Sequence, residues 1–144
     1  MLDQGKEEPV LELKKSITIR PYEERDFPAI HELNKAEGWS NLAEKREDTK
    51  QAWRHSNAAF IAEMEGQVVG CLRGLTDGHI TFYIAELLVH PDWRGQKLGT
   101  YLLNFIHSLY PKTRFELLAS QTSRTFYESL GYRAFCGFRK TIDE

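Results

Sequence analysis

The sequence has little of what would place it in a specialised class of protein. Its two cysteines are too few for a disulfide framework, and neither has a histidine or a second cysteine at the spacing of metal ligands. We interpret Cys71 and Cys136 as small core residues. No apolar run approaches 18 residues, and residues 1–15 lack the apolar centre of a signal peptide. The sequence therefore predicts a cytoplasmic protein that does not enter a membrane.

The sequence also lacks an excess of charge of one sign. The 19 lysines and arginines nearly balance the 21 aspartates and glutamates, the formal net charge is -2, and both signs are mixed along the chain. No field over the whole surface would therefore gather polyanions, so nucleic acid is not an expected partner. The five histidines are scattered without acidic or cysteine neighbours at ligand spacing, so we expect no metal site.

The remaining composition is that of one globular domain. A chain of 144 residues with 41% hydrophobic and 28% charged residues is long enough to bury a core and apolar enough to form one. Residues 1–15 carry charge without a period and are interrupted by Pro9, which predicts a loosely held arm. Residues 16–144 are predicted to form the single domain.

Periodicity predicts a mixed α/β fold. Alternation around Ile17 and Ile19 indicates a strand, and Asp26 and Pro28 precede a helix with apolar residues at three- and four-residue spacing. A second helix is predicted over 42–55, after a loop at 38–41. Apolar runs at 58–64, 67–75 and 79–89 are separated by Glu65-Gly66 and Asp77-Gly78, which predicts an antiparallel meander.

The second half of the sequence adds one strong helix and a shorter one. Apolar residues between 98 and 109 fall on one helix face, and Pro111 ends that segment. A strand at 115–119, a helix at 122–130 ended by Gly131, and a last strand at 132–142 follow. The predicted architecture is a mostly antiparallel sheet with flanking helices.

One loop has the residue types of an anion site. The stretch LLVHPDWRGQKLGT, residues 87–100, takes a buried strand through a short loop with two glycines and two basic residues onto the best helix. Unpaired N–H groups and a positive dipole at a helix N-terminus bind phosphate, and glycine allows close approach. The alternative is a helix entry in which glycine only eases the turn.

The same residues resemble the acetyl-CoA signature of GNAT acetyltransferases. Arg94 and Gly99 occupy the first and last positions of its core, and Lys97 replaces the middle glycine. The run TFYESLGY, residues 125–132, is similar to the late helix of that family, and the order of elements agrees from Ile17 onward. The resemblance implies the GNAT fold, with a V-shaped splay at the centre of the sheet, and acetyl-CoA as co-substrate.

The resemblance also assigns residues to the cofactor. In the family, the pantetheine arm pairs with the exposed edge of the fourth strand, and the pyrophosphate lies on the loop. Ser120 stands where the late helix usually begins with asparagine. The residues so placed are Leu87, Leu88, Val89, Arg94, Gly95, Gln96, Lys97, Leu98, Gly99, Thr100, Ser120, Phe126 and Tyr127.

Three residues are candidates for the chemistry. The N–H of Leu88, or that of a neighbour, would polarise the thioester carbonyl. Tyr127 would protonate the leaving thiolate, or is a core aromatic beside Phe126. Glu86 would accept the amine proton, or is a solvated or ion-paired strand residue.

These assignments predict an acetyl-CoA-dependent N-acetyltransferase. An acetyl group would pass to a primary amine of a small molecule or protein by direct attack in a ternary complex, with no metal. A non-catalytic acyl-CoA-binding module is the alternative, and a nucleotide-phosphate binder of another kind is a third reading. The sequence leaves open the acceptor and the choice between monomer and homodimer.

Overall fold

The computed structural model describes residues 16–144, so the predicted arm at residues 1–15 lies outside the described residues. Five strands form one sheet in the order β1-β2-β3-β4-β5, with β4 and β5 parallel and all other neighbours antiparallel. The strands are β1 (Ile17–Pro21), β2 (Ala58–Met64), β3 (Gln67–Thr76), β4 (Thr81–Val89) and β5 (Arg114–Leu117). The predicted mostly antiparallel sheet is confirmed.

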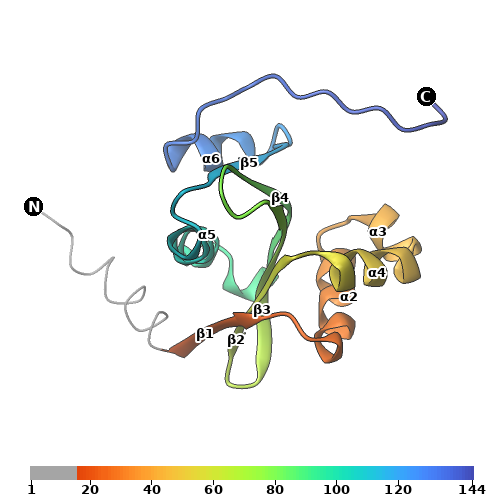
Figure 1. Ribbon diagram of the computed structural model, residues 1–144. Helices are drawn as coiled ribbons and strands as arrows, with labels where there is room; N and C mark the ends of the chain where they lie inside the picture. Colours follow the sequence, from red (N-terminus) through yellow and green to blue (C-terminus); the bar gives the residue numbers. More distant parts are fainter. Residues whose placement is uncertain (1–15) are drawn as a thin grey trace, which may run out of the picture.

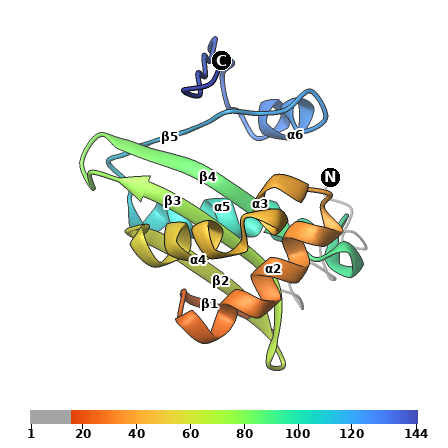
Figure 2. The same cartoon turned by 90° about the vertical axis from the view of Figure 1, so that its right-hand side faces the viewer.

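Helices cover both faces of this sheet (Figures 1 and 2). One face carries α2 (Phe27–Ala36), α3 (Ser40–Glu44) and α4 (Arg46–His55), preceded by the short helix η1 (Glu24–Asp26). The other face carries α5 (Leu98–Leu109), which the short helix η2 (Pro91–Trp93) precedes, and α6 (Arg124–Ser129). Each face has its own core, one centred on α5 and the other on α2 and Trp53 of α4.

Local sequence explains the β2–β3 turn. Glu65 and Gly66 both have positive φ, 49° and 80°, the pair of values that a two-residue type I′ hairpin requires. The backbone twist of such a turn matches the right-handed twist of the two strands, and the two-residue loop fixes the register that pairs Met64 with Gln67. The predicted turn is confirmed.

A β-bulge in β4 changes which side chains face which core. Arg73 of β3 pairs with Glu86, and Gly74 pairs with Ile84, so Ala85 is an extra residue in the ladder. Before the bulge, the buried side chain of Ile84 joins the α5 core. After it, Leu88 joins the α2 core while Leu87 and Val89 pack on the α5 side.

The predicted helix at 42–55 is interrupted, and the predicted loop at 38–41 already contains the start of α3. Lys45 has φ -91° and ψ 50°, outside the helical region, so α3 ends and α4 begins around it. The Thr49 hydroxyl bridges the break, because it donates to the carbonyl of Leu42 in α3 at 2.8 Å and to that of Lys45 at 2.9 Å. Composition shows helix propensity but does not show this break.

Two expectations at the C-terminal end are wrong. Residues 132–142 form no strand, because a strand needs a hydrogen-bonded neighbour and this segment lies beside none within residues 16–144. Cys136 is exposed on that segment, whereas Cys71 is buried in the α2 core as expected.

Candidate active site

The site is built around an opening between β4 and β5. The two strands pair from Thr81 with Arg114 to Ile84 with Leu117, and there the pairing ends. β4 continues to Val89 with β3 on one side only, so residues 85–89 present a free edge where the strands part. The predicted splay is therefore present, and it begins at the bulge.

The direction of the backbone groups on this edge follows from one hydrogen bond. The His90 N–H donates to the Val69 carbonyl of β3 at 2.8 Å. Because successive N–H groups in a strand point to opposite sides, the Leu88 N–H also points to β3, and those of Leu87 and Val89 point to the open edge. Of the sequence-predicted backbone donors, the two neighbours of Leu88 are the ones available to a ligand.

The loop after β4 supplies a turn with two left-handed residues. Gly95 has φ 76°, and Lys97, the residue before α5, has φ 63° and ψ 21°. A lysine in this conformation is strained, because its Cβ approaches the following carbonyl oxygen. Glycine, which the family signature has at this position, would adopt the same conformation without that strain.

Arg94 lies at the end of the open edge but already has a partner. Its Nε donates to the Val89 carbonyl at 3.3 Å, and its Nη2 is ion-paired with Glu37 at the end of α2. With these two contacts made, 48% of the Arg94 side chain is still exposed. A phosphate would meet a guanidinium that Glu37 holds in place and whose charge it partly neutralises.

The first turn of α5 packs closely on α6. A Cβ built on Gly99 would lie 3.4 Å from Phe126 and 3.8 Å from Val89, which are ordinary contact distances, so alanine would also fit where the start of α5 meets the edge of β4. The Leu98 side chain is buried in the core, which leaves only its backbone to face a ligand. Gln96 is exposed, and Thr100 is half-buried on α5.

Tyr127 is buried on the α5 side of the sheet, 9% exposed, in contact with the rings of Phe126 and Tyr132. Burial, with a smaller contribution from Tyr132, raises the pKa of Tyr127 to about 12. The phenol is therefore protonated at neutral pH and is able to donate a hydrogen bond. The predicted alternative, a core aromatic, describes its packing equally well.

Ser120 begins the turn that leads into α6. Its hydroxyl is 3.0 Å from those of Thr122 and Ser123, and its carbonyl accepts from the Arg124 N–H at 3.0 Å. The Ser120 hydroxyl also accepts from the Ser123 N–H at 3.2 Å, so the side chain closes the turn before α6, and the residue is exposed. The Ser120 hydroxyl is accessible to a ligand, but it is already hydrogen-bonded within its own turn.

Glu86 points to the other face of the sheet and is 4% exposed. One carboxylate oxygen is ion-paired with the Nε of Arg73, the residue opposite on β3, and the other oxygen is buried without a partner among the described residues. Burial raises the pKa of Glu86, and the charge and hydrogen bond of Arg73 oppose that shift. The ion-paired alternative is realised, and one proton-accepting oxygen remains uncommitted.

The structure thus separates the predicted residues into two groups. Leu87, Val89, Gly99, Phe126 and Tyr127 come together on the α5 side, around the free edge. The side chains of Glu86 and Leu88 lie on the α2 side. The edge of β4 lies between these two groups.

Sequence reasoning missed the partners of two site residues. Arg73 stands opposite Glu86 only because the bulge shifts the register, and Glu37 reaches Arg94 across 57 positions. Asn34 of α2 was also missed: it is fully buried, and neither its amide nitrogen nor its oxygen has a partner among the described residues. A polar residue inside the apolar period of α2 was the one available signal.

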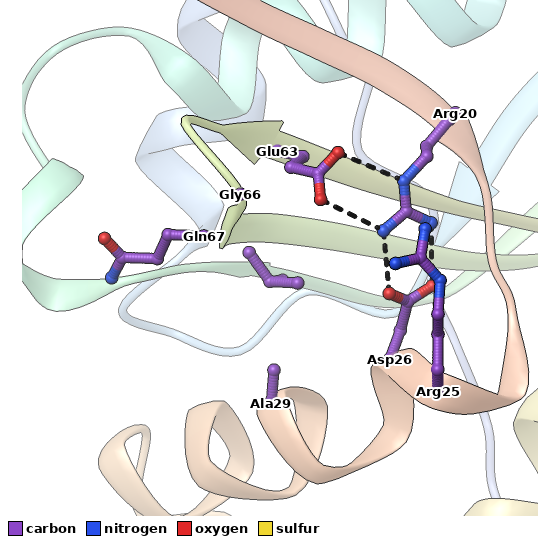
Figure 3. A pocket seen from close by; sticks show the side chains of 8 residues that line it. Arg20, Arg25, Asp26, Ala29, Glu63, Gly66 and Gln67 are labelled. Atoms are coloured by element: carbon purple, nitrogen blue, oxygen red, sulfur yellow. Dashed lines mark hydrogen bonds and ion pairs between the residues drawn. The ribbon is translucent and has the colours of Figure 1, made fainter.

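A second feature lies away from this opening, on the β1–β2 side of the sheet (Figure 3). A hollow of about 520 Å³ is lined by Arg20, Asp26 and Glu63 among others. Arg20 donates to both carboxylate oxygens of Asp26, at 2.8 and 2.7 Å, and to Glu63 at 3.4 Å. Burial raises the pKa of Asp26, but the hydrogen bonds from Arg20 and the Glu23 N–H outweigh it and lower the pKa. The charges compensate one another, which indicates a structural clamp.

Two further findings concern residues 16–144. No cluster of three or more histidine, cysteine, aspartate or glutamate side chains in this range could hold a metal ion. No helix in the same range has the length and apolar character that crossing a membrane requires.

Comparison with known proteins identifies the family. The family model of the acetyltransferase (GNAT) domain matches residues 55–134, more than half of the chain. No curated protein sequence matches the chain. A GNAT-family acetyltransferase from Streptococcus pneumoniae superposes with TM-score 0.72 at 22% identity, over 89% of this chain and 98% of that one.

Two other solved structures carry ligands. An aminoglycoside acetyltransferase from an uncultured soil metagenomic sample, solved with sisomicin, has TM-score 0.63 at 17% identity and covers 90% of this chain and 99% of its own. A Clostridium acetobutylicum protein described as a predicted acetyltransferase, solved with acetyl-CoA, has TM-score 0.64 at 14% identity, over 87% and 95%. At these identities the likeness shows the fold alone, and the family model decides membership: this chain belongs to the GNAT acetyltransferases.

Proposed function

We propose that the protein transfers an acetyl group from acetyl-CoA to a primary amine by direct attack in a ternary complex. The observation that carries the proposal is the free edge of β4 at residues 85–89, which leads into a loop and a helix N-terminus suited to phosphate. A pantetheine arm has amides that can pair with the edge, and the pyrophosphate would lie against the loop at 94–97.

In this arrangement the N–H groups of Leu87 and Val89 are the backbone donors for the cofactor. One of them would pair with the pantetheine, and the other would stabilise the oxyanion that forms when the amine attacks the thioester. A donor of this kind is worth on the order of 3 kcal/mol in the transition state.

Acid and base would act from opposite faces of the sheet. Tyr127, on the α5 side, would protonate the leaving CoA thiolate, since its raised pKa keeps the phenol neutral. Glu86, on the α2 side, would accept the proton of the attacking amine on its unpartnered oxygen. Burial raises the pKa of Glu86, and the charge and hydrogen bond of Arg73 oppose that shift.

The acceptor would therefore approach from the side of α2 and α4. GNAT relatives include an enzyme solved with an aminoglycoside, an amine-rich molecule, which supports a small polyamine or amino sugar among the first acceptors to screen. Trp53 of α4 lies on that side of the sheet, but it is 1% exposed and packs in the α2 core, so it is not available to contact a ligand directly.

Binding is tested first, by thermal unfolding with acetyl-CoA, CoA and ATP. A ligand at a hundred times its dissociation constant stabilises the folded state by about 2.7 kcal/mol. A shift with the CoA compounds only, followed by thiol release from acetyl-CoA in the presence of amines, is the expected result. A shift in Tm without release of thiol from acetyl-CoA, whichever amine is added, would favour the acyl-CoA-binding module. No shift with acetyl-CoA, CoA or ATP would refute both the enzyme and the binding module.

The catalytic roles are tested by two pairs of variants. Tyr127→Phe should lower kcat by about 100-fold, whereas Tyr132→Phe, in the same aromatic cluster, should leave it nearly unchanged. Glu86→Gln should lower kcat/KM by 10²- to 10⁴-fold and remove the fall of kcat/KM on the acidic side of its pH profile. Glu63→Gln, which removes a carboxylate bound to Arg20 in Figure 3, should leave that pH profile unchanged. Full turnover in Tyr127→Phe, or an unchanged profile in Glu86→Gln, would remove that residue from the mechanism.

A further inference from the structure

Arg94 connects the end of the β4 edge to the C-terminal end of α2. Its Nε donates to the Val89 carbonyl at 3.3 Å, and its Nη2 is ion-paired with the Glu37 carboxylate. The two partners come from different elements, and Glu37 stands 57 positions before Arg94. One guanidinium therefore joins the strand proposed to receive the cofactor to a helix on the proposed acceptor side of the sheet.

The Val89 carbonyl is one of the groups that the open edge offers to a ligand. In an antiparallel ladder the N–H and C=O of one residue point to the same side, and the Val89 N–H points away from β3. A Cβ built on Gly70 of β3 would lie 3.1 Å from the Leu88 carbonyl oxygen, so the carbonyl turned towards β3 is that of Leu88. Arg94 thus occupies an acceptor that a pantetheine amide would use.

The position of Glu37 favours a cation beside it. Glu37 directly follows Ala36, the last residue of α2, and its N–H donates to the Leu33 carbonyl at 3.0 Å. The C-terminus of a helix carries a partial negative charge, so a carboxylate there is unfavourable unless a positive group is close. Within residues 16–144, Arg94 is the ion-pair partner that Glu37 has. The guanidinium is therefore held by the carboxylate and by the helix end together.

A pyrophosphate on the loop at 94–97 would compete with Glu37 for this guanidinium, because phosphate oxygens bind arginine through strong charge-assisted hydrogen bonds. We propose that Glu37 and the pyrophosphate of acetyl-CoA exchange at Arg94. Without the cofactor, Glu37 holds the guanidinium on the Val89 carbonyl. The bound pyrophosphate takes the guanidinium over, which frees that carbonyl for the pantetheine arm. Glu37 acts through Arg94, so it is a positioning residue, and the inference rests on the proposed use of acetyl-CoA.

Calorimetric titration with CoA tests the exchange without requiring turnover, at about 0.15 M salt, where charges more than about 8 Å apart are largely screened. Glu37→Gln should tighten CoA binding about two- to fivefold, as expected when an exposed ion pair no longer has to be broken. Arg94→Ala should weaken binding about tenfold, and Glu37→Gln added to Arg94→Ala should have no further effect. The matched control is Glu32→Gln, which removes a carboxylate of the same helix that is paired with Lys35 at 3.3 Å, and it should leave the Kd unchanged.

Other results overturn the inference. Weaker binding in Glu37→Gln would mean that the carboxylate holds Arg94 ready for the phosphate. Equal tightening with and without Arg94, or in Glu32→Gln, would mean that the lost charge acts by its field alone. CoA binding that Glu37→Gln leaves unchanged would refute the exchange and leave the proposed function standing, whereas no CoA binding to the wild type would refute both. Circular dichroism of each variant controls for folding, and the Arg94 and Glu37 side chains are both partly exposed.

Discussion

Replacing Lys97 with glycine should stabilise this protein, although it removes a basic residue from the proposed phosphate loop. Lys97 has φ 63° and ψ 21° directly before α5. The left-handed conformation costs a residue with a Cβ roughly 1–2 kcal/mol. Glycine avoids that cost but loses more conformational freedom on folding, about 0.5–1 kcal/mol. The balance is a gain of about 0.5–1 kcal/mol in the free energy of unfolding.

Urea unfolding of Lys97→Gly should therefore show a higher midpoint with an unchanged m-value, and Tm should rise by about 2–3 °C for a chain of this size. The matched control is Lys97→Ala, which removes the same charge but keeps the Cβ and therefore the strain. It should not be stabilised. Both variants should bind acetyl-CoA a few-fold more weakly, since an exposed charge contributes about 0.2–1 kcal/mol. A lower midpoint in Lys97→Gly than in Lys97→Ala would refute the account of the loop.

Three further predictions follow from other positions. Glu65→Asn should raise the free energy of unfolding by a few tenths of a kcal/mol, because asparagine tolerates positive φ in a type I′ turn better than glutamate; urea unfolding measures this. Gly74→Ala should destabilise by about 1–3 kcal/mol, because its Cβ would lie 2.4 Å from the Phe82 ring, and Phe82→Leu in the same chain should recover part of the loss. Asp77 accepts hydrogen bonds from the N–H groups of Ile80, His79 and Thr81, which lower its pKa to about 2, measurable by NMR titration. Since that folded pKa lies below the unfolded one, its contribution to stability is complete above about pH 4 and is lost as the pH falls towards 2; a titration near 3.8 would contradict the assigned hydrogen bonds.

Local sequence was sufficient where a short-range rule decides the structure. Glu65-Gly66 predicted a hairpin because a glycine between two apolar runs marks a turn, and the apolar positions between 98 and 109 predicted α5 because they fall on one face. The loop and the late helix together were also specific enough for the family, which the match over residues 55–134 confirms.

Tertiary structure decided what depends on pairing between distant segments. The bulge at Ala85 sets the face on which Glu86 lies and brings it opposite Arg73, and no local pattern marks that position. The same ladder turns the N–H groups of Leu87 and Val89, and not that of Leu88, to the free edge. The segment at 132–142 has the composition of a strand, but composition supplies only the faces of a strand. Its hydrogen-bonding partner must come from elsewhere in space, so the sequence determined which segments can pair and the register of the folded sheet determined which of them do.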